Sequence, residues 1–258
     1  MISTMKLTKP SGFLRRKFSR FLTVTVGVLG CVSWLAAGKA AAAPAADAVR
    51  VACVGDSITF GSGIKNRDRD SYPAVLQRLL GTHWDVRNFG VSGATLLKKG
   101  DKPYETQQAH ADALAYAPGI VVILLGTNDS KHPGDGSLEA DHTVDNWQHK
   151  GDYISDYEAL IAEFRRVNPG VKVYVCLPPP CFPGRWGIND KTIHDEIIPL
   201  VRQVAGETKA EIIDINAAMA GKKELFPDTV HPNATGAKLM AETVYQALTG
   251  TIAPATAQ

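Results

Sequence analysis

Acidic residues are absent from residues 1–43, although the whole chain of 258 residues has 26 of them. This segment instead has seven Lys and Arg residues, the apolar run Phe21–Ala37 and an alanine-rich stretch after it. Positive charge, an apolar core and small residues in this order are typical of a secretory signal peptide. We therefore expect residues 1–46 to be a signal peptide and linker, and residues 47–258 to be the mature domain. A retained membrane anchor is the alternative, because the apolar run is near the lower length limit for a membrane span.

The rest of the chain has no excess of positive charge. The full sequence has a formal net charge of +2, but residues 44–258 have 21 Lys and Arg against 26 Asp and Glu. Proteins that bind nucleic acid use a basic patch to neutralise phosphates, so we exclude nucleic-acid partners. Together with the signal peptide, this composition predicts a domain exported to the periplasm or the cell exterior, with no stable membrane association after processing.

Cysteine is scarce, with four in the chain, and Cys31 lies in the predicted signal peptide. Three cysteines in the remaining domain do not make a disulfide framework. Cys53 lies in an apolar run, where we expect it to be a small buried hydrophobic residue. Cys176 and Cys181 flank three prolines and are close enough in sequence to pair, although this spacing does not require a disulfide.

Several motifs of metal, nucleotide and hydrolase sites are missing. The histidines and cysteines show neither H-E-x-x-H nor a paired-cysteine zinc spacing, so no metal is expected. The chain has no Walker loop, and Gly61–Gly63 lacks the third glycine of a dinucleotide fingerprint, so no cofactor is expected. No G-x-S-x-G is present either, which excludes the larger α/β-hydrolase fold.

The longest stretch without a helix or strand pattern is residues 129–150. A loop of this length is either functional or disordered. It is rich in His and Asp but shows no recognisable ligand spacing, and we interpret it as a solvated polar loop rather than a metal site. The residues concerned are His132, His142, His149, Asp135, Asp141 and Asp145.

Short apolar runs alternate with helical patterns from Val49 onward. Strands are expected at 49–54, 84–89, 120–125, 171–176 and 210–215, and helices at 72–80, 104–115, 151–167, 190–207 and 232–248. Near-continuous apolar strands joined by helices predict one α/β domain, in which helices cover both faces of a parallel sheet. Ligands of such sheets bind beyond the carboxyl ends of the strands, so the residues that follow each strand are the candidates for chemistry.

Ser57 follows the first expected strand and is the candidate nucleophile. A serine hydroxyl needs a base to take its proton. His231 is the candidate base, because Asp228 precedes it by three residues in a tight turn that ends at Pro232. This spacing allows the carboxylate to hold one ring nitrogen while the other faces Ser57, and Pro232 is expected in the first turn of the last helix. The alternative is that Asp228 is only a turn or helix-capping residue.

Acyl transfer also needs hydrogen-bond donors for the oxyanion of the tetrahedral intermediate. Three candidates follow the expected strands: the backbone N–H of Ser57, the backbone N–H of Gly90 and the side-chain amide of Asn128. A glycine at position 90 allows close approach of the backbone, because it has no Cβ. Taken alone, Gly90 is equally typical of the end of a strand and Asn128 of a turn.

Taken together, these blocks resemble the GDSL or SGNH hydrolase family. Gly55–Thr59 (GDSIT) resembles its first block, Gly90 its second, Asn128 in Gly126–Asp129 (GTND) its third, and Asp228–His231 (DTVH) its last. The resemblance extends from about Val49 to Leu248. It implies a three-layer α/β/α sandwich with a flavodoxin-like, five-stranded parallel sheet. It also implies ester hydrolysis through an acyl-serine intermediate, without a metal.

A second resemblance concerns the substrate. Residues 177–190 and the segment around Trp147 are similar to the sialate-O-acetylesterase-like branch of that family, which implies removal of acetyl groups from sugars. The substrate would then be a small-molecule or oligosaccharide ester, and Trp147 and Trp186 would offer flat apolar faces to sugar rings. The alternative is that both tryptophans pack their loops onto the domain.

Two other functions compete with sugar deacetylation. A lysophospholipase or acyl-thioesterase shares the same four blocks. A non-catalytic glycan-binding surface protein on this fold is disfavoured, because no catalytic position is missing.

Overall fold

The computed structural model describes residues 43–133 and 143–254. The predicted signal peptide and linker therefore lies outside the described residues, except for residues 43–46. No helix within the two described ranges is long and apolar enough to cross a membrane.

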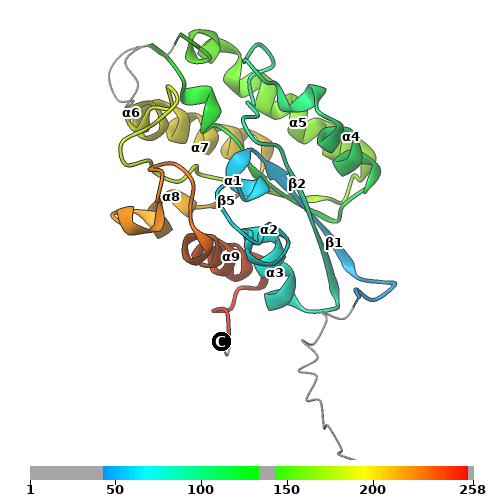
Figure 1. Cartoon of the computed structure of the whole chain (residues 1–258). Helices are drawn as coiled ribbons and strands as arrows, with labels where there is room; N and C mark the ends of the chain where they lie inside the picture. The colour runs from blue at the N-terminus through cyan, green and yellow to red at the C-terminus, as the bar shows by residue number, and fades with distance from the viewer. Residues whose placement is uncertain (1–42, 134–142, 255–258) are drawn as a thin grey trace, which may run out of the picture. The chain divides into compact units, whose positions relative to one another are not determined.

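Five parallel strands form one sheet in the order β2-β1-β3-β4-β5 (Figure 1). They are β1 (Val49–Gly55), β2 (Trp84–Gly90), β3 (Ile120–Leu124), β4 (Lys172–Cys176) and β5 (Glu211–Ile213). This is the strand order of flavodoxin-like folds. Every residue of β3 is buried, whereas every residue of the edge strand β2 is half-buried or exposed. The apolar runs thus predicted the central strands because these are covered on both faces.

Alternate side chains of each central strand point into two separate cores. Ala52 and Val54 of β1 contribute to one core with α4 (Gln108–Ala115), α5 (Tyr153–Val167) and α7 (Ile198–Thr208). Val51 and Cys53 contribute to the other with α3 (Tyr72–Leu80), α8 (Ile215–Met219) and α9 (Ala234–Thr249). Helices therefore cover both faces (Figure 1), and the prediction of a three-layer α/β/α sandwich is confirmed.

Two expected helices are interrupted. The helix expected at 104–115 is a 3₁₀ turn, Tyr104–Thr106, and then α4, because Gln107 between them is extended. The helix expected at 190–207 consists of α6 (Asp190–Thr192), a π-helical segment (Ile193–Ile197) and α7. Pro199 explains the second irregularity, since it has no N–H to donate to the carbonyl four residues earlier.

The last helix begins later than expected. Asn233 is its N-cap, and the Asn233 side chain accepts the backbone N–H of Gly236 at 3.0 Å. Pro232 therefore precedes α9 rather than lying in its first turn, because the cap satisfies a helix N–H that would otherwise be unpaired.

The described cysteines are free. Cys53, Cys176 and Cys181 are all buried and form no disulfide. The burial predicted for Cys53 is confirmed, and the optional pairing of Cys176 with Cys181 is absent. The remaining short elements are α1 (Ser57–Phe60), α2 (Arg67–Asp70) and the 3₁₀ turns Asn128–Ser130, Trp147–Asp152 and Lys223–Leu225.

Candidate active site

Three residues from two distant parts of the chain form a hydrogen-bonded row at the carboxyl edge of the sheet. These residues, Ser57, His231 and Asp228, are called the triad below. The Oγ atom of Ser57 lies 2.9 Å from Nε2 of His231, and Nδ1 of His231 lies 2.8 Å from Oδ2 of Asp228. Ser57 is the first residue of α1, directly beyond β1, whereas the other two precede α9. In this geometry the imidazole can take the serine proton while the carboxylate fixes its tautomer.

The turn that carries His231 is held by the same carboxylate. Oδ1 of Asp228 accepts the backbone N–H groups of Val230 at 3.1 Å and His231 at 2.7 Å, which leaves Oδ2 for the ring. Thr229 between them has a left-handed φ of 74°. Asp228 is therefore both a turn residue and the partner of the imidazole, so the two interpretations of the sequence are compatible.

The charge of Asp228 is preserved by these contacts. Burial alone would raise the pKa of this carboxyl group, but the hydrogen bonds from the backbone and ring of His231 and from the backbone of Val230 outweigh it and lower the pKa. Asp228 is consequently ionised at neutral pH and can accept a hydrogen bond from the His231 ring.

Ser57 owes its position to its two preceding residues. The side chain of Asp56 caps α1 by accepting the backbone N–H of Ile58 at 2.8 Å. At Gly55, an added Cβ would lie 2.1 Å from Oγ1 of Thr59 and 2.5 Å from the carbonyl oxygen of Leu124. Only glycine allows the strand to turn into α1 so close to β3. Asp56 is thus a structural neighbour of the serine.

The prediction that Gly90 offers its N–H to an oxyanion is wrong for this structure. That N–H donates to Oδ1 of Asn88 at 2.9 Å, and Nδ2 of Asn88 donates to the carbonyl of Thr59 at 2.9 Å. An added Cβ at Gly90 would lie 2.2 Å from the backbone nitrogen of Phe60. Gly90 is therefore needed because α1 packs directly on it, and its N–H is already engaged.

Gly93 is a better placed donor that the sequence analysis did not select. It has a left-handed φ of 81°, and no described residue accepts its backbone N–H in a hydrogen bond. Its neighbour Ala94 accepts the side-chain amide of Asn128 at 3.1 Å, which brings Gly93 beside the predicted donor Asn128. One amide hydrogen of Asn128 is left for another acceptor. The GVSG segment (residues 90–93) has a glycine at each end, and the sequence alone does not show that the Asn88 side chain accepts the N–H of the first one.

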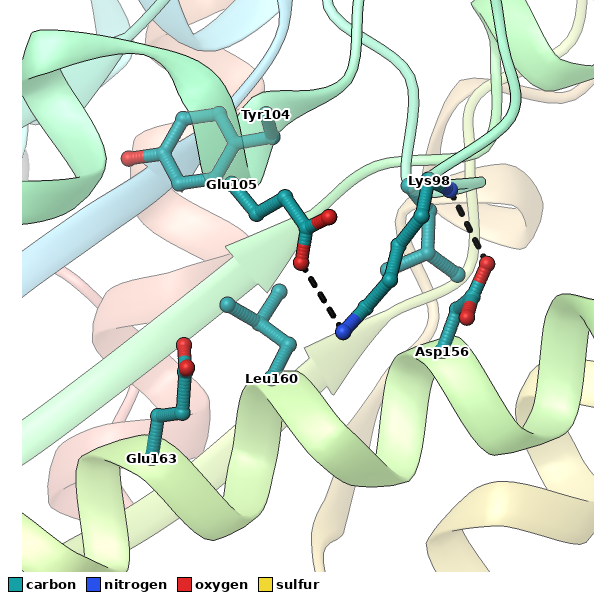
Figure 2. Close-up of a pocket in the computed structure, with 7 residues that line it drawn as sticks. Lys98, Tyr104, Glu105, Asp156, Leu160 and Glu163 are labelled. Atoms are coloured by element: carbon teal, nitrogen blue, oxygen red, sulfur yellow. Dashed lines mark hydrogen bonds and ion pairs between the residues drawn. The ribbon is translucent and has the colours of Figure 1, made fainter.

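The loop after Ala94 is fastened to the domain by carboxylates. Buried Asp129 accepts the backbone N–H groups of Leu96 at 3.0 Å and Leu97 at 2.7 Å. Figure 2 shows the next contacts, in which Lys98 pairs with Glu105 at 2.8 Å and its backbone N–H donates to Asp156 of α5 at 2.9 Å. The cavity there measures about 10 Å³, which holds about one water and excludes a sugar. This region therefore fixes the loop to the domain and is too small to hold a sugar.

The D-x-x-H-P pattern of Asp228 and His231 occurs a second time in the sequence, at Asp129 and His132. The carboxylate of this second Asp accepts backbone N–H groups of the loop instead, and Nε2 of His132 lies 3.1 Å from Oγ1 of Thr192. Of the predicted polar loop, His142, Asp135 and Asp141 lie outside the described residues. Within the described part of the chain, no group of three or more His, Cys, Asp or Glu residues is arranged to hold a metal ion.

A model of the GDSL-like lipase/acylhydrolase family matches residues 53–239, which include all five predicted catalytic and oxyanion residues. The chain belongs to this family. It is 42% identical over 234 residues to an acetylxylan esterase of Xylanibacter ruminicola, covering 84% of this chain and 46% of the relative. It is 24% identical over 227 residues to the cellulase/esterase CelE of Acetivibrio thermocellus, covering 80% and 26%. The chain thus spans less than half the length of these two curated relatives.

Solved structures agree with the fold of this GDSL-like domain. A carbohydrate acetylesterase from Sinorhizobium meliloti has a TM-score of 0.58 at 20% identity, covering 78% of this chain and 99% of that chain. An acetylxylan esterase from Geobacillus stearothermophilus has a TM-score of 0.59 at 20% identity, covering 79% and 96%. At these identities the likeness concerns the fold alone.

The two predicted sugar-binding tryptophans of the GDSL-like domain differ in position. Trp147 is only 5% exposed, packs edge-on against Tyr153 at 5.6 Å and donates its indole N–H to Glu196 at 2.9 Å. A sugar ring cannot stack on a side chain that is buried in this way, so the prediction for Trp147 is wrong. Trp186 is 37% exposed, and its ring centroid lies 5.4 Å from that of His231.

The Asp56 carboxyl group should make the stability of the domain depend on pH. Its side chain is fully buried. Burial raises its pKa to about 7, with a smaller opposing effect from the Ile58 hydrogen bond and a further rise from the charge of Asp129. The folded state therefore binds this proton more tightly than the unfolded state between about pH 4 and pH 7.

Asp56→Asn tests this linkage, because the amide keeps the Ile58 hydrogen bond but does not titrate. Stability from the proton is complete below about pH 4 and is lost as the pH rises to about 7. Relative to D56N, the wild-type free energy of unfolding should fall by about 1–4 kcal/mol between pH 4 and pH 8, measured by urea unfolding. The control D68N changes a side chain that is 91% exposed and should show no such trend. A difference between wild type and D56N that is constant with pH would contradict the assignment.

Proposed function

We propose that this protein is a serine esterase that removes acetyl groups from carbohydrates through an acyl-serine intermediate. The observation that carries the proposal is the row of hydrogen bonds from Ser57 through His231 to Asp228, at 2.9 and 2.8 Å. The family membership supports ester hydrolysis. The 42% identity to an acetylxylan esterase and the fold shared with a carbohydrate acetylesterase support the acetyl group and the sugar.

The proposed reaction begins when Oγ of Ser57 attacks the acetyl carbonyl and Nε2 of His231 takes the serine proton. The backbone N–H groups of Ser57 and Gly93 and the amide of Asn128 donate to the oxyanion. Loss of one such donor costs about 2.7–4 kcal/mol in the transition state. His231 then protonates the leaving sugar oxygen as the acyl-serine forms, and a water activated by His231 releases acetate and restores Ser57.

The alternative lysophospholipase or thioesterase needs an apolar surface for a long acyl chain. Five large apolar side chains are exposed among the described residues, and of these Trp186 has a ring contact with His231. The others lie at the start of β1, at the end of α5, in β5 and after α9: Val49, Val167, Ile212 and Ile252. This distribution supports a short acyl group. A non-catalytic glycan-binding role is disfavoured because the triad is complete and hydrogen-bonded.

A series of p-nitrophenyl esters and an acetylated xylo-oligosaccharide test the proposal. We expect kcat/KM to fall at least about tenfold from acetate to octanoate, because a polar site gives a long chain no apolar surface to bury. We also expect acetate release from the oligosaccharide. Ser57→Ala should lower kcat by about 10⁴-fold or more on both kinds of substrate while the unfolding midpoint stays close to that of the wild type. A maximum of kcat/KM at octanoate or longer would favour the lysophospholipase, and turnover by S57A would exclude the mechanism.

Trp186 is proposed to hold the sugar ring beside the triad. Its ring is tilted by 45° to that of His231, and its backbone has a left-handed φ of 55°. Trp186→Ala should lower kcat/KM on the acetylated oligosaccharide by about tenfold and on p-nitrophenyl acetate by less than about twofold, because only the sugar uses the indole face. Trp147→Phe is the control, since it alters a buried indole and should affect both substrates alike. Equal losses in W186A would mean that Trp186 only packs its loop.

We further propose that the protein is exported, with its mature chain beginning after a residue between Ala42 and Ala46. The basic and apolar composition of residues 1–37, followed by alanines, supports cleavage there. Sequencing the N-terminus of protein secreted by the producing cells should find it within residues 43–47. An intact Met1 in a membrane fraction would instead support a retained anchor.

A further inference from the structure

A cleft of about 540 Å³ lies between residues 63–70, which follow α1, and Ala234, the first residue of α9. It adjoins the triad at Gly63, where an added Cβ would lie 3.9 Å from Cβ of His231. Gly63 is exposed and has a left-handed φ of 79°, which glycine adopts without strain. No side chain at position 63 therefore separates His231 from the cleft, and the volume is in the range of a small-molecule site.

One uncompensated positive charge lines this cleft. Arg69 is neutralised by Asp70, whose two carboxylate oxygens bind it at 2.9 and 3.0 Å. Lys65 is exposed, and among the residues that the structure describes no carboxylate lies within ion-pair distance of its ammonium group. The N-terminal end of the 16-residue helix α9 adds a partial positive charge at Ala234.

The rest of the cleft suits a sugar ring. Ile64 is partly buried against the core and leaves some apolar surface for the C–H face of a ring. The Asn66 side chain is exposed and makes no capping hydrogen bond to α2, so its amide is available to sugar hydroxyls. The cleft thus combines an apolar contact, a hydrogen-bonding amide and one cation, and it adjoins His231 at Gly63.

We propose that this cleft binds a carboxylate-bearing sugar unit, a uronic acid, of the same molecule whose acetyl group reaches Ser57. Lys65 provides the charge that selects the carboxylate, and Gly63 keeps the passage to His231 open. The natural substrate is then an acidic O-acetylated oligosaccharide or polysaccharide. This inference rests on the proposed carbohydrate esterase function, which it narrows to a substrate class.

Two acetylated xylo-oligosaccharides of equal length, one neutral and one carrying a glucuronic acid unit, test this inference with p-nitrophenyl acetate as a third substrate. The wild type should prefer the acidic oligosaccharide. In Lys65→Ala, the KM for the acidic oligosaccharide should rise by about five- to tenfold with little change in kcat. The kinetic constants for the other two substrates should stay within about twofold of the wild type. Lys65→Arg should retain the preference. Added 0.3 M NaCl should weaken it in the wild type but not in K65A, because salt screens an exposed charge pair.

Lys172→Ala is the matched control, because Lys172 is also exposed but lies at the first residue of β4, at the opposite end of the sheet from the triad. K172A should behave as the wild type on all three substrates. Acetate release from both oligosaccharides, without a preference or with equal effects of K65A on both, would overturn the uronic acid site alone. Release from neither oligosaccharide, with p-nitrophenyl acetate still hydrolysed, would contradict the proposed function and the inference together.

Discussion

The hydrogen bond between Oγ of Ser57 and Nε2 of His231 joins residues that are 174 positions apart in the chain. Its length depends on where α1 begins above β1 and on where the turn before α9 ends. The helix α9 packs against α3 in the core that contains Val51 and Cys53 of β1, so the same core fixes both partners of the hydrogen bond. Packing of one layer of the sandwich is thus the constraint on which the site depends.

Residues next to the triad serve this constraint rather than the chemistry. The Asp56 side chain caps α1, and Gly55 and Gly90 allow α1 to lie against β3 and β2 without a Cβ between them. Asp129 fixes the loop beside Asn128 in the same way, through two backbone N–H groups. The GDSIT and GTND blocks therefore each contain one residue that we propose takes part in the reaction, Ser57 or Asn128, and residues that position it.

The parts of the structure that the sequence predicted are those in which neighbouring residues share one environment. The central strands were predicted closely because they are covered on both faces and therefore appear as continuous apolar runs. The helix α3 was predicted closely because its apolar residues lie along one face. The contacts that join Ser57, His231 and Asp228 were predicted from the pair Asp228 and His231, whose own contact is local. Gly90 and Trp147 were assigned wrongly because their partners are not visible in a local pattern: Asn88 takes the N–H of Gly90, and Glu196, 49 residues away, holds the indole of Trp147.

Covalent labelling of Ser57 is the most direct test of the acyl-serine mechanism. Diethyl p-nitrophenyl phosphate should add one diethylphosphoryl group to the peptide that contains Ser57, as measured by mass spectrometry, and abolish esterase activity in the same proportion. The labelling rate should fall by about 100-fold or more in His231→Ala, because the base no longer activates the hydroxyl. A label on another residue in the inactivated protein, or labelling of Ser57 at an unchanged rate in H231A, would contradict the mechanism.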